Sequence, residues 1–319
     1  MKPLATQSNL VLGCGTGYSA EQLLPFVSSL RGTGYDGNLA LVVDEAQARP
    51  LEELAGRFAV TLIPLAPRPR WLPAGAVARL QNRGRMRWIH AMLEAALPTA
   101  MRHPAAAAAL GMRLRYFLHI ACGRYGIYYS WLYPRRRAYA NVLLTDVRDV
   151  IFQADPFSFT SGLGLDFFMD PVVCLGDEPI NTEWMTTVYG AGVCAVHRGK
   201  RISCSGTTMG DTGSILHYLR AMLIGLSRVL TRITGLPGVD QAVHNFLLWE
   251  GRLPGAALRE NGHYAVMTLK NADSRAFQWD AAGRLLNADG NPAPVLHQYD
   301  FHPALKPSTP SLHRAGANP

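Results

Sequence analysis

Residues 141–152 read NVLLTDVRDVIF, an apolar run that ends in two carboxylates and then resumes. The runs at 142–144 and 150–152 have the composition of buried strands, so the polar residues between them need a partner that offsets their burial. The sequence leaves two kinds of partner open for these acids. Asp146 and Asp149 could hold a hard divalent cation that carries a diphosphate, or they could form ion pairs with arginines, namely Arg148, Arg135, Arg136 and Arg137.

The segment TDVRDVIFQADPF at 145–157 resembles the Asp-x-Asp region of GT-A fold glycosyltransferases, especially nucleotide-sugar transferase-like proteins with a DVRDV motif. The resemblance implies an α/β fold with a Rossmann-like, mixed but mostly parallel sheet flanked by helices. It also implies that the acids hold Mn2+ or Mg2+ against the diphosphate of a nucleotide-sugar donor. The family's acids lie two residues apart, whereas Asp146 and Asp149 are three apart, so which of them is a direct ligand stays open.

The composition is that of a globular chain with a substantial core, since 48% of its 319 residues are hydrophobic. We expect one GT-A-like domain over 1–319, with a helical, arginine-rich insertion at about 66–140 and a loose tail after about 306. The 31 Lys+Arg and 23 Asp+Glu residues give a net charge of +8. This charge suits an anionic ligand, a nucleic acid or an anionic membrane surface without choosing among them.

The cysteines and the apolar runs predict a cellular location. Five cysteines without CxxC spacing indicate neither a zinc cluster nor a disulfide framework, which favours a reducing cytoplasm. We expect no signal peptide, and no apolar run is long enough for a transmembrane helix. Peripheral contact with an anionic membrane is a further expectation from the charge.

The first 65 residues alternate between strand and helix patterns. A strand in NLVLGCGTGY at 9–18, a helix at 20–31 and a strand at 38–44 are followed by a short helix at 51–58 and a strand at 59–65. This order favours a parallel sheet with helices on its faces. Residues 212–233 predict the clearest helix, whose apolar face we expect to pack on the sheet rather than on a membrane.

The glycine-rich segment GCGTG at 13–17 competes with the acid pair as the main binding site. It resembles the first motif of class I S-adenosylmethionine methyltransferases, with Leu12 where those enzymes have an acid and Asp44 near the place of their second acid. In a GT-A fold the same loop would contact the donor's base and ribose. The candidate cofactor-binding residues are therefore Cys14, Gly15, Thr16, Gly17, Tyr18, Asp44 and Arg148, although the glycines could also form only a tight turn.

The segment GVDQAVHNFL at 238–247 resembles the Asp-Gln then Asn segment of glycogenin-like and galactosyltransferase-like GT-A enzymes. There it begins a helix that faces the sugar, which implies catalytic roles for Asp240 and Gln241 and substrate binding by Asn245. A carboxylate at a helix start can bind sugar hydroxyls, but it can equally cap the helix.

Two further segments complete the expected site. SCSGTT at 203–208 resembles the family's small-residue loop after a strand, which implies an acceptor site at Ser205, Gly206, Thr207 and Thr208; an ordinary turn is the alternative. PVLHQYD at 294–300 predicts a short strand ending in His297, which resembles the late histidine that completes the metal shell. A surface or hydrogen-bonded histidine would have the same pattern.

The order of these segments implies a glycosyltransferase that moves a hexosyl group from a nucleotide-diphosphate sugar to a glycan, lipid-linked or protein hydroxyl. One alternative is a methyltransferase built on 13–17 and Asp44. Another is an inactive sugar-nucleotide-binding relative in which Arg148 replaces the cation. Nucleic-acid binding is not expected, because the arginines are scattered among apolar positions instead of forming a face with exposed aromatics.

Overall fold

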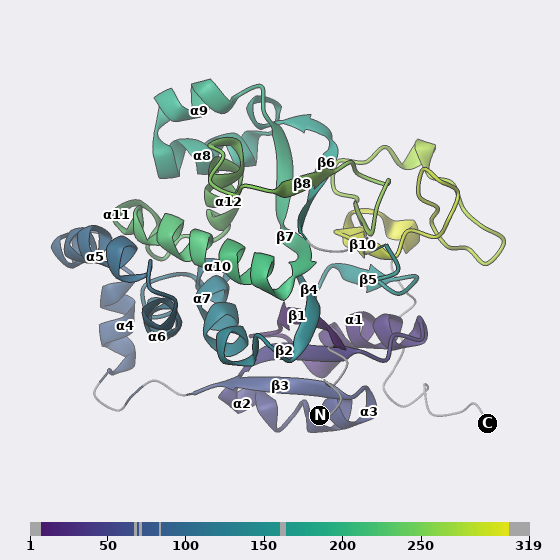
Figure 1. The fold of residues 1–319 in the computed structure, drawn as a ribbon, viewed down its shortest axis with the longest axis horizontal. Helices are drawn as coiled ribbons and strands as arrows, with labels where there is room; N and C mark the ends of the chain where they lie inside the picture. The colour runs from purple at the N-terminus through teal and green to yellow at the C-terminus, as the bar shows by residue number, and fades with distance from the viewer. Residues whose placement is uncertain (1–7, 67–68, 70–71, 83, 160–163, 306–319) are drawn as a thin grey trace, which may run out of the picture.

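The computed structural model describes residues 8–66, 69, 72–82, 84–159 and 164–305, so the tail expected after about 306 lies outside the described residues. The described chain contains a seven-stranded sheet with strand order β3-β2-β1-β4-β7-β6-β8 and a three-stranded sheet β5-β10-β9. Helices cover the large sheet (Figure 1). The chain is therefore an α/β protein with a mixed, mostly parallel sheet, an arrangement compatible with a Rossmann-like fold.

The amino-terminal half supplies the parallel strands. β1 (Ser8–Cys14) pairs in parallel with β2 (Asn38–Asp44) on one side and with β4 (Tyr139–Thr145) on the other. β3 (Val60–Leu65) extends the sheet beyond β2. The connecting helices are α1 (Ala20–Gly32), α2 (Glu45–Ala48) and α3 (Glu52–Arg57). The predicted strands and the parallel order are confirmed.

The carboxyl-terminal half adds the antiparallel strands. β7 (Arg201–Asp211) lies between β4 and β6 (Leu165–Cys174) and is antiparallel to both, while β8 (Ala256–Arg259) pairs in parallel with β6. In the small sheet, β10 (Val295–His297) pairs with β5 (Val150–Phe152) and with β9 (Val266–Thr268). Through this second sheet, β10 near the carboxyl terminus lies beside β5, the strand that follows β4.

The predicted loop at 203–208 is wrong. Residues 201–211 form one continuous strand, because Leu144 and Thr145 of β4 pair with Thr208 and Thr207, and β6 pairs along the other edge. Hydroxyl-bearing and β-branched residues are compatible with a buried central strand once both edges are paired.

Four helices occupy the segment 66–140 that we predicted to be helical: α4 (Ala74–Leu80), α5 (Arg87–Ala100), α6 (Pro104–Leu114) and α7 (Ile120–Leu132). α6 and α7 approach closely at two glycines. A Cβ atom on Gly126 would lie 2.2 Å from the carbonyl oxygen of Gly111, so no side chain fits at this crossing. α7 in turn packs on α10 (Thr212–Ser227).

The helix predicted at 212–233 is two helices in the structure. α10 ends at Ser227, Val229 has a non-helical φ of −131°, and α11 (Leu230–Ile233) follows as a separate turn. The predicted apolar face of α10 is fully buried, as expected for a helix packed on a sheet. The remaining helices are α8 (Pro179–Tyr189), α9 (Ala191–His197) and α12 (Asp240–Trp249). Within the described ranges, no helix is both long and apolar enough to cross a bilayer.

Candidate metal centre

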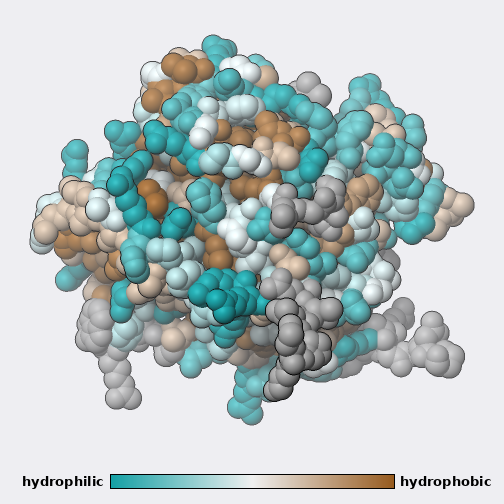
Figure 2. Space-filling view, in the orientation of Figure 1, coloured by the Kyte–Doolittle hydropathy of each residue, from teal (hydrophilic) through white to brown (hydrophobic). Residues whose placement is uncertain are grey.

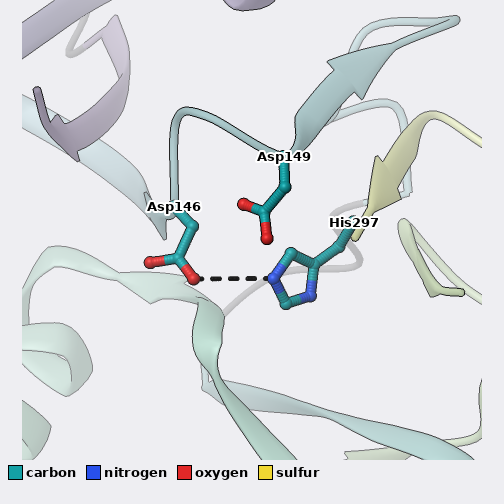
Figure 3. Close-up of side chains that lie close together, drawn as sticks. All are labelled: Asp146, Asp149 and His297. Atoms are coloured by element: carbon teal, nitrogen blue, oxygen red, sulfur yellow. Dashed lines mark ion pairs between the residues drawn. The ribbon is translucent and has the colours of Figure 1, made fainter. Parts of the chain in front are cut away.

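Asp146, Asp149 and His297 come together at the carboxyl end of β4. Asp146 directly follows β4, Asp149 directly precedes β5, and His297 ends β10, whose register places it opposite Val150. The main-chain N–H of Gln298 donates to the Asp149 carbonyl at 2.6 Å, which fixes this junction. One potential ligand atom from each of the three side chains lies within 4.8 Å of the other two (Figure 3).

The environment of His297 fits a divalent cation. The imidazole is fully buried, and neither ring nitrogen has a hydrogen-bond partner among the described residues; Nε2 lies 3.6 Å from Oδ2 of Asp146. A Cβ atom on Gly206 would lie 2.5 Å from Oδ2 of Asp146 and 2.9 Å from the imidazole, so only glycine leaves this space open. Two carboxylates and one imidazole suit Mn2+ better than Mg2+, which prefers oxygen ligands throughout.

An arginine also reaches the acids, but it is not one that we predicted. Arg124 of α7 forms an ion pair with Asp146, and its Nη2 lies 3.2 Å from Oδ2 of Asp240. The predicted partner, Arg148, instead pairs with Asp300 at 3.2 Å. Arg124 therefore links the cluster at β4 to the start of α12.

Two of the other predicted arginines are also engaged elsewhere. Arg135 donates to the carbonyl of Trp131 at 3.0 Å, and Arg136 donates to the carbonyl of Tyr133 at 2.9 Å. Their guanidinium groups also stack over the aromatic rings of the same two residues. These contacts stabilise the end of α7 rather than the acid pair.

The charges in the cluster shift one another's proton affinities. Burial acts to raise the pKa of Asp146, but the Arg124 guanidinium and His297 hold that pKa well below its usual range. Burial raises the pKa of Asp149, against the opposing effect of His297. Burial acts to lower the pKa of His297, yet Cys204 and Asp146 hold it well above its usual value. The acidic neighbours of His297 therefore oppose the effect of its burial.

The cluster lies beside a cavity of about 350 Å³. Cys14 at the end of β1 and Asp146 after β4 line this cavity together, and the sheet order reverses direction between these two strands. In open α/β sheets, ligands bind outside the carboxyl ends of the strands at such a reversal. The structure brings these predicted site residues to the cavity wall: Cys14, Thr16, Tyr18, Asp146, Arg148, Asp149, Ser205, Gly206, Asp240 and Gln241.

Other predicted site residues do not line the cavity: Gly15, Gly17, Asp44, Thr207, Thr208, Asn245 and His297, which is buried behind Asp146 and Asp149. Asp44 is exposed at the start of α2, and Thr207 and Thr208 are buried within β7. Asn245 is fully buried, and its amide binds the main chain of Ser203. The acid that a methyltransferase would need therefore lies away from this cavity.

Asp240 begins α12 as predicted, but its side chain does not occupy the cap position, which belongs to Val239. The Asp240 carboxylate instead accepts from the Tyr125 hydroxyl at 3.1 Å and from Arg124. Burial raises its pKa, while Arg124 opposes this shift. Gln241 binds the main chain of β7, because its amide accepts from Ser205 N at 2.7 Å and donates to the Ser203 carbonyl at 2.8 Å. Asp240 thus faces the cavity, and Gln241 holds β7 in place beside it.

Sequence reasoning missed several cavity residues: His119, Arg124, Asp170, Asn181, Trp184, Cys204 and Lys270. Asp170 of β6 is buried, its Oδ1 has no hydrogen-bond partner among the described residues, and burial raises its pKa to about 6. It could have been found by the argument that identified Asp146, since it too is an acid within an apolar strand. Arg124 lies on a helix, where the surrounding sequence does not indicate that its side chain reaches the cavity.

The arrangement can hold an anionic ligand and a cation together. Positive charge on the cavity wall comes from Arg124, Arg148 and Lys270. Negative charge comes from Asp146, Asp149, Asp170 and Asp240. Tyr18 and Trp184 add aromatic surface to its wall. No protein-family model matches the chain, and no curated protein matches it at a significant level of sequence similarity.

Proposed function

We propose that this protein is a GT-A-like, metal-dependent glycosyltransferase that moves a hexosyl group from a nucleotide-diphosphate sugar to a hydroxyl acceptor. The observation that carries the proposal is the convergence of Asp146, Asp149 and His297 within 4.8 Å beside the cavity at the β1–β4 reversal. A cation and a phosphate-bearing ligand satisfy the charges of this site together, which neither would do alone.

Asp146, Asp149 and His297 would hold the cation, which when bound would neutralise the phosphates as the nucleoside diphosphate departs. Arg124, whose side chain is 12% exposed, would donate hydrogen bonds to the same phosphates. Lys270, which also lines the cavity, would add a further positive charge. These groups would bind the part of the donor on which negative charge develops.

The residues at the end of β1 would receive the nucleoside. Thr16 and Tyr18 line the cavity just beyond that strand, and the Tyr18 ring offers a surface on which a base could stack. This placement supports the nucleotide-binding role that the glycine-rich segment predicted. It requires no acid at Asp44.

Transfer forms a bond between the acceptor oxygen and the anomeric carbon and breaks the bond from that carbon to the phosphate oxygen. The acceptor proton passes to a basic group or to the departing phosphate. Asp240, held by Arg124 and Tyr125, would orient the donor sugar and offset positive charge at the anomeric carbon. Ser205 and Gly206 would form the adjoining wall, and Gln241 would position them through its bonds to β7.

One observation favours a second candidate, a sugar-nucleotide-binding protein without turnover. The Arg124 guanidinium already pairs with Asp146, one of the three proposed ligands. A protein of this kind would bind the nucleoside diphosphate equally well without a cation. It would also release no nucleoside diphosphate from a sugar nucleotide.

A thermal-shift experiment separates these possibilities. UDP, GDP and S-adenosylmethionine are each added with and without Mn2+ to the wild type, to Asp149→Ala and to the exposed control Asp289→Ala. A ligand that binds the folded state raises the melting temperature by mass action. The transferase proposal expects one nucleoside diphosphate to stabilise the wild type and the control only with Mn2+, and Asp149→Ala not at all.

Two other results would contradict the proposal. Stabilisation by S-adenosylmethionine alone, unchanged by metal or by Asp149→Ala, would move the site to residues 13–17. Metal-independent stabilisation by a nucleoside diphosphate, with no nucleoside diphosphate released from UDP-hexoses or GDP-hexoses, would support the second candidate.

A further inference from the structure

The positive charge of the chain is concentrated in one segment. Residues 66–140 contain 13 arginines and a single acidic residue, Glu94. The rest of the chain contains 18 Lys+Arg and 22 Asp+Glu and is therefore slightly acidic. The helices α4 to α7 lie in the basic segment. Of these, α4, α5 and α6 lie at the left side of the molecule, and α7 lies between them and the large sheet (Figure 1).

Helix α5 in this segment exposes an apolar stripe. Trp88 is 65% exposed and Met92 is 64% exposed, and they are one turn apart on the same face. The same face continues with exposed alanine and threonine side chains at helical spacing, namely Ala91, Ala95 and Thr99. The opposite face buries His90 and Leu97 against the neighbouring helices. Single exposed apolar residues are ordinary, but a continuous stripe along a helix indicates an interaction surface.

Charged residues lie at the ends of the stripe rather than within it. Arg85 and Arg87 are exposed before and at the start of α5, and Arg102 is exposed just beyond its end. Glu94 is half-buried and points to α11, because its carboxylate accepts from the N–H of Thr231 at 3.1 Å. Figure 2 shows brown and pale-brown surface at the left edge of the molecule, where Figure 1 places α5.

We propose that this face of α5 docks onto an anionic lipid bilayer, with the helix lying in the plane of the membrane surface. A helix with one apolar face and basic flanks binds in this way, with its apolar side chains at the headgroup level. The indole of Trp88 is suited to that level, because its ring is apolar and its N–H can meet water or headgroups. The flanking arginines attract anionic lipids.

The charge pattern separates this partner from two others. A second copy of the chain would bring two arginine-rich segments face to face, and like charges oppose that contact. A nucleic acid would require arginines within the contact face, whereas the exposed centre of the stripe is apolar. The inference is independent of the reaction in the cavity, so it can fail while the proposed function stands.

The test is flotation of the purified full chain with vesicles of phosphatidylcholine alone or mixed with phosphatidylglycerol, at low and high salt. We expect binding to the anionic vesicles only, and less of it at high salt. The variant Trp88→Asp with Met92→Asp should lower the partition coefficient more than tenfold. Arg87→Ser should lower it about fivefold, since one arginine near the surface contributes about 1 kcal/mol.

A matched control carries the same substitutions at exposed apolar residues elsewhere. Trp279 is 42% exposed and Val196 is 77% exposed, so Trp279→Asp with Val196→Asp should leave vesicle binding unchanged. Unchanged melting temperatures would establish that both double variants are folded. The blue shift of tryptophan fluorescence on vesicle addition should be smaller in Trp88→Phe than in the wild type.

Three results would overturn the inference. The first is no binding to anionic vesicles at low salt. The second is binding that the Trp88→Asp, Met92→Asp variant retains in full. The third is that the wild type does not bind vesicles but forms a concentration-dependent dimer or binds single-stranded RNA, and that the double variant loses this dimerisation or RNA binding.

Discussion

Two polar clusters lie on either side of β7, and they differ in how far their hydrogen bonds are satisfied. In the closed cluster, which comprises Ser203, Tyr218, Gln241, His244 and Asn245, the side chains bind one another or the main chain of β7. In the open cluster, which comprises Asp146, Asp149 and His297, both ring nitrogens of the buried histidine lack a hydrogen-bond partner among the described residues.

The difference shows when a buried polar group indicates a ligand. Both clusters contain residues that the sequence predicted for the site, a metal-binding set in the open cluster and the substrate-binding Asn245 in the closed one. The amide of Asn245, however, binds the main chain of Ser203 at 2.9 and 3.0 Å. A satisfied network stabilises and specifies the fold, whereas buried groups without partners need an ion, a ligand or water. The open cluster is therefore the better candidate for function, and the closed cluster is structural.

The largest effect is expected at Arg124, which supplies the open cluster with its counter-charge. Arg124→Met leaves Asp146 and Asp240 without their guanidinium partner and should lower the free energy of unfolding by about 3–5 kcal/mol, measured by urea denaturation. Mn2+ should recover more stability in this variant than in the wild type, because the guanidinium no longer competes for Asp146. Arg135→Met, at an exposed arginine of the same helical segment, should change the stability by less than about 0.5 kcal/mol. A loss no larger than in this control would show that the ion pair is dispensable.

The strands could be predicted because their patterns are local. The apolar runs of β1, β2 and β4 and the helix between β1 and β2 follow from periodicity alone. β7 could not be predicted in the same way. Its polar residues, among them Thr207 and Thr208, are buried only because β4 and β6 pair along both of its edges, and pairing of distant strands leaves no local pattern.

The acidic half of the candidate site could be predicted for a similar reason. Asp146, Asp149 and His297 each adjoin a short apolar strand. A polar residue in such a pattern is expected to be buried, and this can be recognised from the sequence. Arg124 lies on α7 among aromatic residues, and only the packing of that helix brings it to β4. The position that a long side chain on a helix reaches depends on how the helix packs, and residue spacing in the sequence does not reveal this packing.

Asn245 provides the converse test in the closed cluster. Asn245→Ala removes one acceptor and two donor contacts and leaves the N–H and carbonyl of Ser203 with fewer partners. Each lost hydrogen bond costs about 1 kcal/mol, so we expect a loss of about 2–3 kcal/mol in urea denaturation. The stabilisation by Mn2+ should be the same as in the wild type. A variant that kept full stability but lost its response to Mn2+ would reverse the assignment of the two clusters.

His244 makes the closed cluster sensitive to pH. Burial lowers its pKa to about 3 from the ordinary value of 6.5. The unfolded chain therefore binds a proton below about pH 6.5 that the folded protein does not bind until about pH 3, so stability falls as the pH drops through this window. The slope from this residue should approach about 1.4 kcal/mol per pH unit. Urea denaturation should give a shallower dependence for His244→Gln and an unchanged one for His263→Gln, an exposed histidine.

Substitution of Asp149 should change stability only slightly, and with the opposite sign. Burial raises its pKa, so at neutral pH the folded protein holds a carboxylate that the unfolded chain accommodates more easily. This cost appears as the pH rises from the unfolded value of 3.8 through the folded pKa and is constant above it. Asp149→Asn should therefore raise the stability of the metal-free protein by on the order of 1 kcal/mol while removing its response to Mn2+.

The matched substitution at Asp211 should change stability in the other direction. Burial acts to raise the pKa of Asp211, but hydrogen bonds from Ser214 hold it below its usual value, and the side chain caps α10. Asp211→Asn removes a charge that favours the helix start and should cost about 0.5 kcal/mol, with the Mn2+ response retained. Opposite signs in this pair would mean that Asp149 is kept at a cost in stability, which is the expected property of a binding residue and not of a structural one. If both variants were destabilised alike, the open cluster would be a structural ion pair network, and the proposed metal centre would lose its main support.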